Sequence, residues 1–100
     1  MTPEAKVKNA VKALLEAEHV YYVMPFGGGY GRAGVADIIA CVNGYFIAIE
    51  CKAGKGRTTA LQERELGMVR LAGGVGIVVY EDLSALVGWI HTLRQRSPHG

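Results

Sequence analysis

The feature that most constrains the fold is the dipeptide Asn43-Gly44, which separates two short apolar runs, Ile38–Val42 and residues 45–50. Asn and Gly both tolerate the positive φ angles of a type I′ turn, so this dipeptide between such runs predicts a β-hairpin with a two-residue turn. Such a turn also fixes the register of the two strands, because the residues that flank it must face each other.

Helix and strand signals flank this hairpin on both sides. Thr2-Pro3-Glu4 is typical of a helix start, with a capping Thr and Pro at the first helical position. Thr59-x-x-Gln62 is a capping box for a second helix, which Gly73-Gly74 ends. The expected elements are, in chain order, a helix to about residue 18, strands at 20–24, 38–42 and 45–50, a helix from Thr59 to Gly73, a strand at 75–80 buried on both faces, and a helix from Asp82 or Ser84 to about residue 93.

Length and composition limit the class of protein. The chain has 100 residues, of which 50% are hydrophobic and 20% charged, so we expect one globular domain over residues 1–100, with a frayed tail from about residue 94. No apolar run reaches the ~20 residues that span a bilayer, and the start lacks a secretory signal, so we expect no membrane association and a cytoplasmic location. Two cysteines do not make a disulfide scaffold, and a net charge of +2 neither demands nor excludes nucleic acid.

The hairpin register brings two acidic residues together at the open end of the hairpin. Asp37 should lie directly opposite Glu50, with Cβ atoms ~4.5–5.5 Å apart. Lys52 falls on the same face of the strand as Glu50. Two like charges at this distance repel, and proteins tolerate them when one acid is protonated or a cation lies between them.

An Asp, a Glu and a Lys in one patch are suited to metal-assisted hydrolysis of a phosphodiester. Carboxylate oxygens are hard ligands for Mg²⁺ or Mn²⁺, and the Lys ammonium can stabilise developing negative charge or orient the attacking water. Two plainer interpretations remain open. Asp37 could be only a turn residue, with Glu50 and Lys52 on a solvated strand end, and a one-residue slip of register would place the acids on different faces.

These residues carry a family resemblance. Gly34-Val35-Ala36-Asp37, then Glu50-Cys51-Lys52, then Gln62 resemble the PD-(D/E)xK nucleases, and among them most of all the virus-type replication–repair nuclease (VRR-NUC) domain. The resemblance implies an α/β fold with a restriction-endonuclease-like core of order α-β-β-β-α-β, here with an extra C-terminal helix, and a mixed four-stranded sheet flanked by helices. Ala36 is a departure, because the family usually has proline before the aspartate.

The resemblance also assigns roles to residues. It implies that Asp37 and Glu50, together with the backbone carbonyl of Cys51, bind Mg²⁺ or Mn²⁺, and that Lys52 completes the active site. A glutamate on the first helix and a glutamine on the following helix belong to the pattern, and Glu4 and Gln62 are the candidates. Glu4 could equally complement a helix N-terminus, and Gln62 could equally serve only its capping box.

Four residues are candidates for DNA contacts. Tyr30 and Arg32 lie in a glycine-rich run that formally matches G-x-G-x-x-G, but a strand rather than a helix is expected to follow, so we expect no nucleotide cofactor. Lys55 and Arg57 follow Lys52 in a loop that begins at the proposed site, which favours phosphate contacts. For all four, the alternative is an exposed charged or polar side chain without a partner.

These observations together predict a metal-dependent DNA endonuclease. The resemblance implies selectivity for branched DNA, such as a Holliday junction, in phage or bacterial repair, recombination or replication. The alternative is a non-catalytic α/β module for nucleic-acid binding or assembly, in which the acids are structural. We also expect a homodimer through the last helix or residues 27–34, because Trp89, Leu86, Ile90 and Leu93 give that helix more apolar surface than a small monomer can bury; a monomer with this helix capping the core is the alternative.

Overall fold

The computed structural model describes residues 1–26 and 33–99. Its mixed four-stranded sheet has the strand order β1-β2-β3-β4, in which β1, β2 and β3 are antiparallel neighbours and β4 runs parallel to β3. The α/β class and the element order expected from the sequence are confirmed. The elements are α1 (Pro3–Ala17), β1 (Tyr21–Val23), β2 (Ile38–Val42), β3 (Tyr45–Cys51), α2 (Ala60–Leu71), β4 (Val75–Val79) and α3 (Ser84–Gln95).

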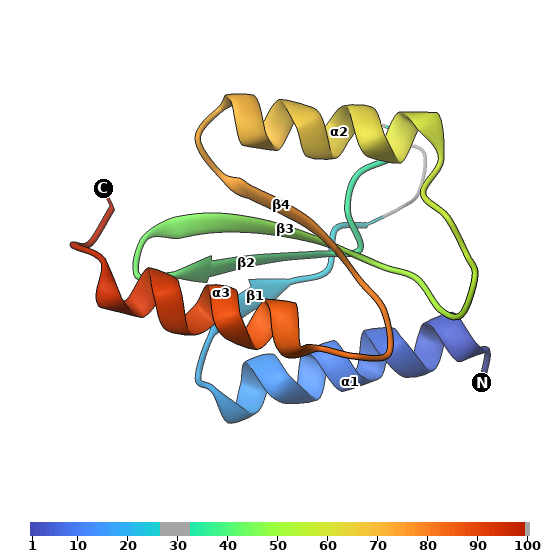
Figure 1. Ribbon diagram of the computed structural model, residues 1–100, viewed down its shortest axis with the longest axis horizontal. Helices are drawn as coiled ribbons and strands as arrows, with labels where there is room; N and C mark the ends of the chain where they lie inside the picture. The colour runs from blue at the N-terminus through green and yellow to red at the C-terminus, as the bar shows by residue number, and fades with distance from the viewer. Residues whose placement is uncertain (27–32, 100) are drawn as a thin grey trace.

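The helices form a layer on each face of the sheet. Helices α1 and α3 cover one face, and α2 lies on the other (Figure 1). The alternation of side chains along β3 explains this division: Ile47 and Ile49 point into the larger core, whereas Ala48 packs beneath Leu66 of α2. No helix in the described ranges is long and apolar enough to cross a membrane.

The predicted hairpin and its register are confirmed. Val42 pairs with Tyr45, and the ladder continues to Ile38 and Ile49. Asn43 and Gly44 have φ angles of 54° and 83°, as the two central positions of a type I′ turn require. A side chain at position 44 would also collide with the chain, because a Cβ there would lie 1.9 Å from the carbonyl oxygen of His99.

The end of the chain packs against this turn instead of fraying from residue 94. Helix α3 continues to Gln95, and the Asn43 side-chain amide donates hydrogen bonds to the carbonyls of Leu93 and Arg96 at 3.0 and 2.9 Å. The Tyr45 hydroxyl donates to the Ser97 carbonyl at 2.9 Å. The sequence did not predict this docking, because the polar tail shows no periodic pattern and its partners lie some 50 residues earlier.

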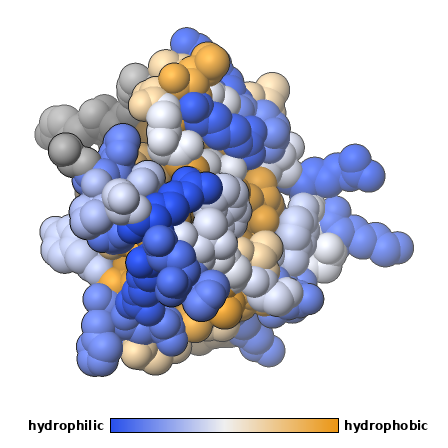
Figure 2. All heavy atoms as spheres, turned by 60° about the vertical axis from the view of Figure 1, so that its left-hand side comes forward, coloured by the Kyte–Doolittle hydropathy of each residue, from blue (hydrophilic) through white to orange (hydrophobic). Residues whose placement is uncertain are grey.

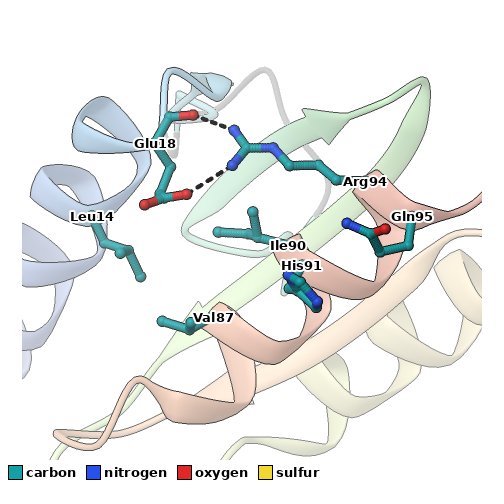
Figure 3. A pocket seen from close by; sticks show the side chains of 7 residues that line it. All are labelled: Leu14, Glu18, Val87, Ile90, His91, Arg94 and Gln95. Atoms are coloured by element: carbon teal, nitrogen blue, oxygen red, sulfur yellow. Dashed lines mark hydrogen bonds and ion pairs between the residues drawn. The ribbon is translucent and has the colours of Figure 1, made fainter.

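Helices α1 and α3 are joined at the C-terminal end of α1. The Arg94 guanidinium forms an ion pair with the Glu18 carboxylate at 2.7 Å and donates a second hydrogen bond to the Glu18 carbonyl. Figure 3 shows both bonds closing one side of a small pocket between the helices. The pocket is lined by Leu14, Glu18, Val87, Ile90, His91, Arg94 and Gln95.

Two local expectations differ from the structure. Strand β4 lies at the edge of the sheet and packs against the core on both faces, but most of its residues are only partly buried, so the expected full burial is wrong. Helix α3 begins after Leu83 without a side-chain cap. Asp82 instead accepts hydrogen bonds from the amide and hydroxyl of Ser84, at 2.9 and 2.6 Å.

More large apolar side chains are exposed on α2 than on α3, where Val87 is exposed. Leu86, Ile90 and Leu93 are at most 2% exposed within the chain's own core and Trp89 is half-buried, so these four residues leave little apolar surface for a partner. Leu61, Met68 and Leu71 of α2 are exposed, and Figure 2 shows hydrophobic residues at the top of the molecule, at the height of α2. The reason first given for a homodimer is therefore wrong, although dimerisation itself stays a prediction.

Candidate active site

The open end of the hairpin places Asp37 beside β3. The last ladder pair is Ile38 with Ile49, so the next position on each strand is Asp37 and Glu50. The Cys51 amide donates a hydrogen bond of 2.8 Å to Asp37 Oδ2, which holds the aspartate against the end of the neighbouring strand. The two acids thus lie side by side on the face of the sheet that α2 covers, as the register predicts.

Glycine at position 34 allows the segment before Asp37 to reach α2. Gly34 has a φ of +85°, and a Cβ there would lie 2.6 Å from the backbone of Leu61. Both the left-handed backbone and the close approach exclude a side chain. The start of α2 and the start of β2 are therefore in contact, and this contact brings the first turn of α2 to the acidic pair.

Glu50 is a buried carboxylate with an unequal environment at its two oxygens. The residue is 2% exposed. Its Oε2 accepts a 2.9 Å hydrogen bond from the Gln62 side-chain amide and lies 3.6 Å from Lys52 Nζ. Its Oε1 is buried without a hydrogen-bond partner among the described residues. A buried acceptor without a donor is unfavourable, so Oε1 marks an unfilled position in the site.

The pKa of Glu50 is raised, and burial is the main cause. It raises the pKa of Glu50 from 4.5 to about 7, with a further contribution from the negative charge of Asp37, while Lys52 opposes the increase. The carboxylate form is therefore disfavoured without an additional cation. The repulsion that the sequence predicts between the two facing acids therefore contributes to the raised pKa of Glu50.

Lys52 connects the acidic pair to the first helix. Its Nζ lies 3.6 Å from Glu50 Oε2 and 3.8 Å from Glu4 Oε1. Lys52 is only 9% exposed, so its ammonium is held inside the site and does not extend into solvent. The structure thus brings Glu4, on α1, to the same cluster as Asp37, Glu50 and Lys52.

Gln62 completes its capping box and also contacts Glu50. Its side-chain oxygen accepts a hydrogen bond from the Thr59 backbone amide at 2.9 Å. The Gln62 backbone amide in turn donates to the Thr59 hydroxyl at 3.2 Å, which completes the capping box. The side-chain NH₂ of Gln62 donates to Glu50. A glutamine can serve both because its amide carries an acceptor and two donors.

The sequence argument missed one residue of the cluster, Lys8. Its Nζ lies 3.4 Å from Asp37 Oδ1, and its side chain is 30% exposed. The sequence places Lys8 on the polar face of the first helix, where a solvated charge is the usual outcome. The available signal is its spacing: Lys8 follows Glu4 by four residues, which puts both side chains on one face of α1.

The structure describes two of the four candidates for DNA contacts. Tyr30 and Arg32 lie outside the described residues. Lys55 and Arg57 are exposed and line a shallow hollow together with Tyr80. Glu81 and Tyr80 fix this loop, because the Glu81 carboxylate accepts from the Gly54 amide at 3.0 Å and the Tyr80 hydroxyl donates to the Gly56 carbonyl at 2.9 Å.

The thiol of Cys51 is not a candidate ligand. The side chain packs in the core beneath α1 and α3, and burial raises the pKa of the thiol to about 12. A thiol must lose its proton to bind a metal. Cys41 is exposed and Cys51 is buried, and both are free thiols that form no disulfide. The backbone carbonyl of Cys51 stays a predicted metal ligand.

The acidic pair fits a hard divalent cation. Mg²⁺ is commonly held by one or two carboxylates while it keeps several waters, and Asp37 with Glu50 supplies two. The unpartnered Glu50 Oε1 is the specific observation that favours a cation here. No cluster of three or more His, Cys, Asp or Glu side chains in the described part of the chain is arranged to enclose a metal, so any ion bound by this pair must complete its shell with backbone oxygens, water or substrate.

Comparison with known proteins gives no relative for this chain. Protein-family models, curated proteins and solved structures were all searched, and none matches.

Proposed function

We propose that this protein is a Mg²⁺- or Mn²⁺-dependent DNA endonuclease with a PD-(D/E)xK core of the VRR-NUC kind. The observation that carries the proposal is the buried Glu50 beside the half-buried Asp37. Glu50 Oε1 has no partner among the described residues, and a nearly buried lysine, Lys52, lies 3.6 Å from Glu50 Oε2. Structural acids at a strand end are normally solvated, because burying a charge is unfavourable. A buried acid with a perturbed pKa, a second acid beside it and an oxygen left without a donor is an arrangement that favours a functional metal site over a structural one.

Each residue of the cluster has a role in this proposal. Asp37 and Glu50 would hold the cation, with the Cys51 carbonyl as a further ligand. The bound cation would polarise a phosphate oxygen and lower the pKa of a water. Lys52 would stabilise the negative charge that develops on the phosphate. Gln62 fixes the orientation of Glu50, and Glu4 holds the Lys52 ammonium toward the site.

The substrate and setting rest on the family resemblance. They are structure-selective cleavage of branched or junction DNA, in phage or bacterial repair, recombination or replication, by a cytoplasmic homodimer. Lys55 and Arg57 support contact with a phosphate backbone, because they are exposed in a loop that begins one residue after Lys52. Such contacts position a nucleic acid without reading its sequence.

Nicking of supercoiled plasmid tests the proposal. We expect cleavage with Mg²⁺ or Mn²⁺ and none with EDTA. Lys52→Ala should lower the rate about 10²–10³-fold, the usual effect of losing one oriented charge donor. Lys6→Ala, on the exposed side of α1, is the matched control and should cleave like the wild type. Linear, flapped and four-way junction DNAs in the same assay measure structure preference.

The alternative function makes a different prediction in this assay. A non-catalytic binding module would shift DNA in a gel while leaving it intact with every metal. Equal cleavage by the wild type and Lys52→Ala would instead point to a contaminating nuclease. Either result would overturn the proposed function.

A further inference from the structure

Lys8 is the strongest unassigned feature at the site. Two of the four carboxylate oxygens of the acidic pair already have partners that a bound cation would leave in place: Asp37 Oδ2 accepts from the Cys51 amide, and Glu50 Oε2 accepts from Gln62. The two that remain are Glu50 Oε1, which is unpartnered, and Asp37 Oδ1, which lies 3.4 Å from Lys8 Nζ. A cation that binds the pair through the oxygen of each carboxylate that accepts no amide hydrogen bond therefore takes the oxygen that Lys8 now holds.

The surroundings of Lys8 and Lys52 differ in a way that separates their roles. Lys52 has carboxylates on two sides, and its side chain is 11% exposed. Lys8 contacts one carboxylate, and its side chain is 30% exposed. A flexible, half-solvated ammonium can change partners at low cost because solvent screens its ion pair.

We propose that Lys8 exchanges partners at this site: it neutralises Asp37 in the metal-free protein, yields Asp37 Oδ1 to the divalent cation, and then binds a phosphate of the DNA. The inference rests on the proposed function. Once its carboxylate partner is engaged by the cation, the Lys8 ammonium lies at the rim of the site, and Glu4, the acid one turn earlier on α1, already faces the Lys52 ammonium at 3.8 Å. A phosphate brought to the same cation is an anion that carries no such partner and can take the place of Asp37.

Binding of Mn²⁺ without DNA tests the first half of the exchange. Isothermal titration should show that Lys8→Gln binds Mn²⁺ about fivefold more tightly than the wild type, as expected from removing a competing, partly exposed ion pair. Lys8→Arg keeps the positive charge and should bind like the wild type. Lys6→Gln changes the same net charge on the exposed side of α1 and should have no effect. Equal affinity of Lys8→Gln and the wild type would overturn the inference.

The salt dependence of DNA binding tests the second half. In a Lys52→Ala background with Mn²⁺, where cleavage should be slow enough to measure binding, adding Lys8→Gln should reduce the slope of log K against log salt by about 0.7–0.9, the contribution of one phosphate contact. Adding Lys6→Gln should leave the slope unchanged. An unchanged slope with Lys8→Gln would overturn the exchange, even if Mn²⁺ binds more tightly. No Mn²⁺ binding by the wild type would overturn the proposed function as well, so the two failures are distinguishable.

Discussion

Replacing Glu50 with glutamine should stabilise the metal-free protein at alkaline pH. Glutamine has nearly the shape of a protonated glutamate, can still accept the hydrogen bond from Gln62, and offers an NH₂ group to the Asp37 carboxylate. The pKa of Glu50 is raised from 4.5 to about 7 by burial and by Asp37, against the attraction of Lys52. Glu50→Gln removes this charge while it retains most of the packing.

The magnitude follows from that pKa. The difference between 4.5 and about 7, at about 1.4 kcal/mol per pH unit, amounts to about 3–4 kcal/mol. A raised carboxyl pKa means that the folded state binds the proton more tightly than the unfolded state. The favourable contribution is therefore complete below pH 4.5 and is lost as pH rises through 7, so wild-type stability should fall over this range. A change of this size corresponds to roughly 12–20 °C in Tm for a domain of this length.

Urea denaturation with EDTA at pH 4.5 and pH 8.5 measures the effect. We expect Glu50→Gln to match the wild type at the lower pH and to exceed its free energy of unfolding by about 3–4 kcal/mol at the higher pH. Glu16→Gln is the control, because Glu16 is exposed and a glutamine can still accept its hydrogen bond from Tyr22. A Glu50→Gln variant that is less stable than the wild type at pH 8.5 would refute the reasoning, since the carboxylate would then be a well-accommodated structural group.

Three further predictions concern the metal, Gln62 and assembly. Millimolar Mn²⁺ should raise the Tm of the wild type and not of Asp37→Asn, because a ligand that binds only the folded state stabilises it; an equal increase in both proteins, measured by differential scanning fluorimetry, would place the metal elsewhere. Gln62→Glu should keep the capping box, yet slow plasmid cleavage at least tenfold because it replaces the donor to Glu50 with a third negative charge; circular dichroism verifies the helix, and full activity would restrict Gln62 to capping. Light scattering behind size exclusion should give about twice the chain mass of 10.7 kDa; a mass near that of one chain at micromolar concentration would contradict the homodimer.

Local signals explain why the hairpin and its acids could be predicted. The Asn43-Gly44 turn fixes a register, and a register places Asp37 beside Glu50 without any knowledge of the remaining fold. The capping box likewise located the start of α2 and Gln62. These features depend on residues close in sequence, which is where pattern arguments are strongest.

The remaining parts depend on contacts between distant segments. The ion pair of Lys8 with Asp37 joins α1 to the start of β2, and the docking of residues 96–99 on the hairpin joins the end of the chain to its middle. The edge position of β4 follows from the strand order of the whole sheet. The apolar residues of α3 suggested a surface patch, but their burial depends on how α1 and the sheet cover them.

The central claim is that Asp37 and Glu50 together hold the catalytic cation, and a crystal structure of the protein soaked in Mn²⁺ tests it most directly. Data collected at the manganese absorption edge locate the ion without relying on any mutation. The account predicts an anomalous peak at roughly 2.1–2.2 Å from Asp37 Oδ1 and Glu50 Oε1, close to the ~2.0–2.1 Å typical of Mg²⁺–oxygen bonds. A peak bound by other residues, or none at a saturating Mn²⁺ concentration, would contradict it.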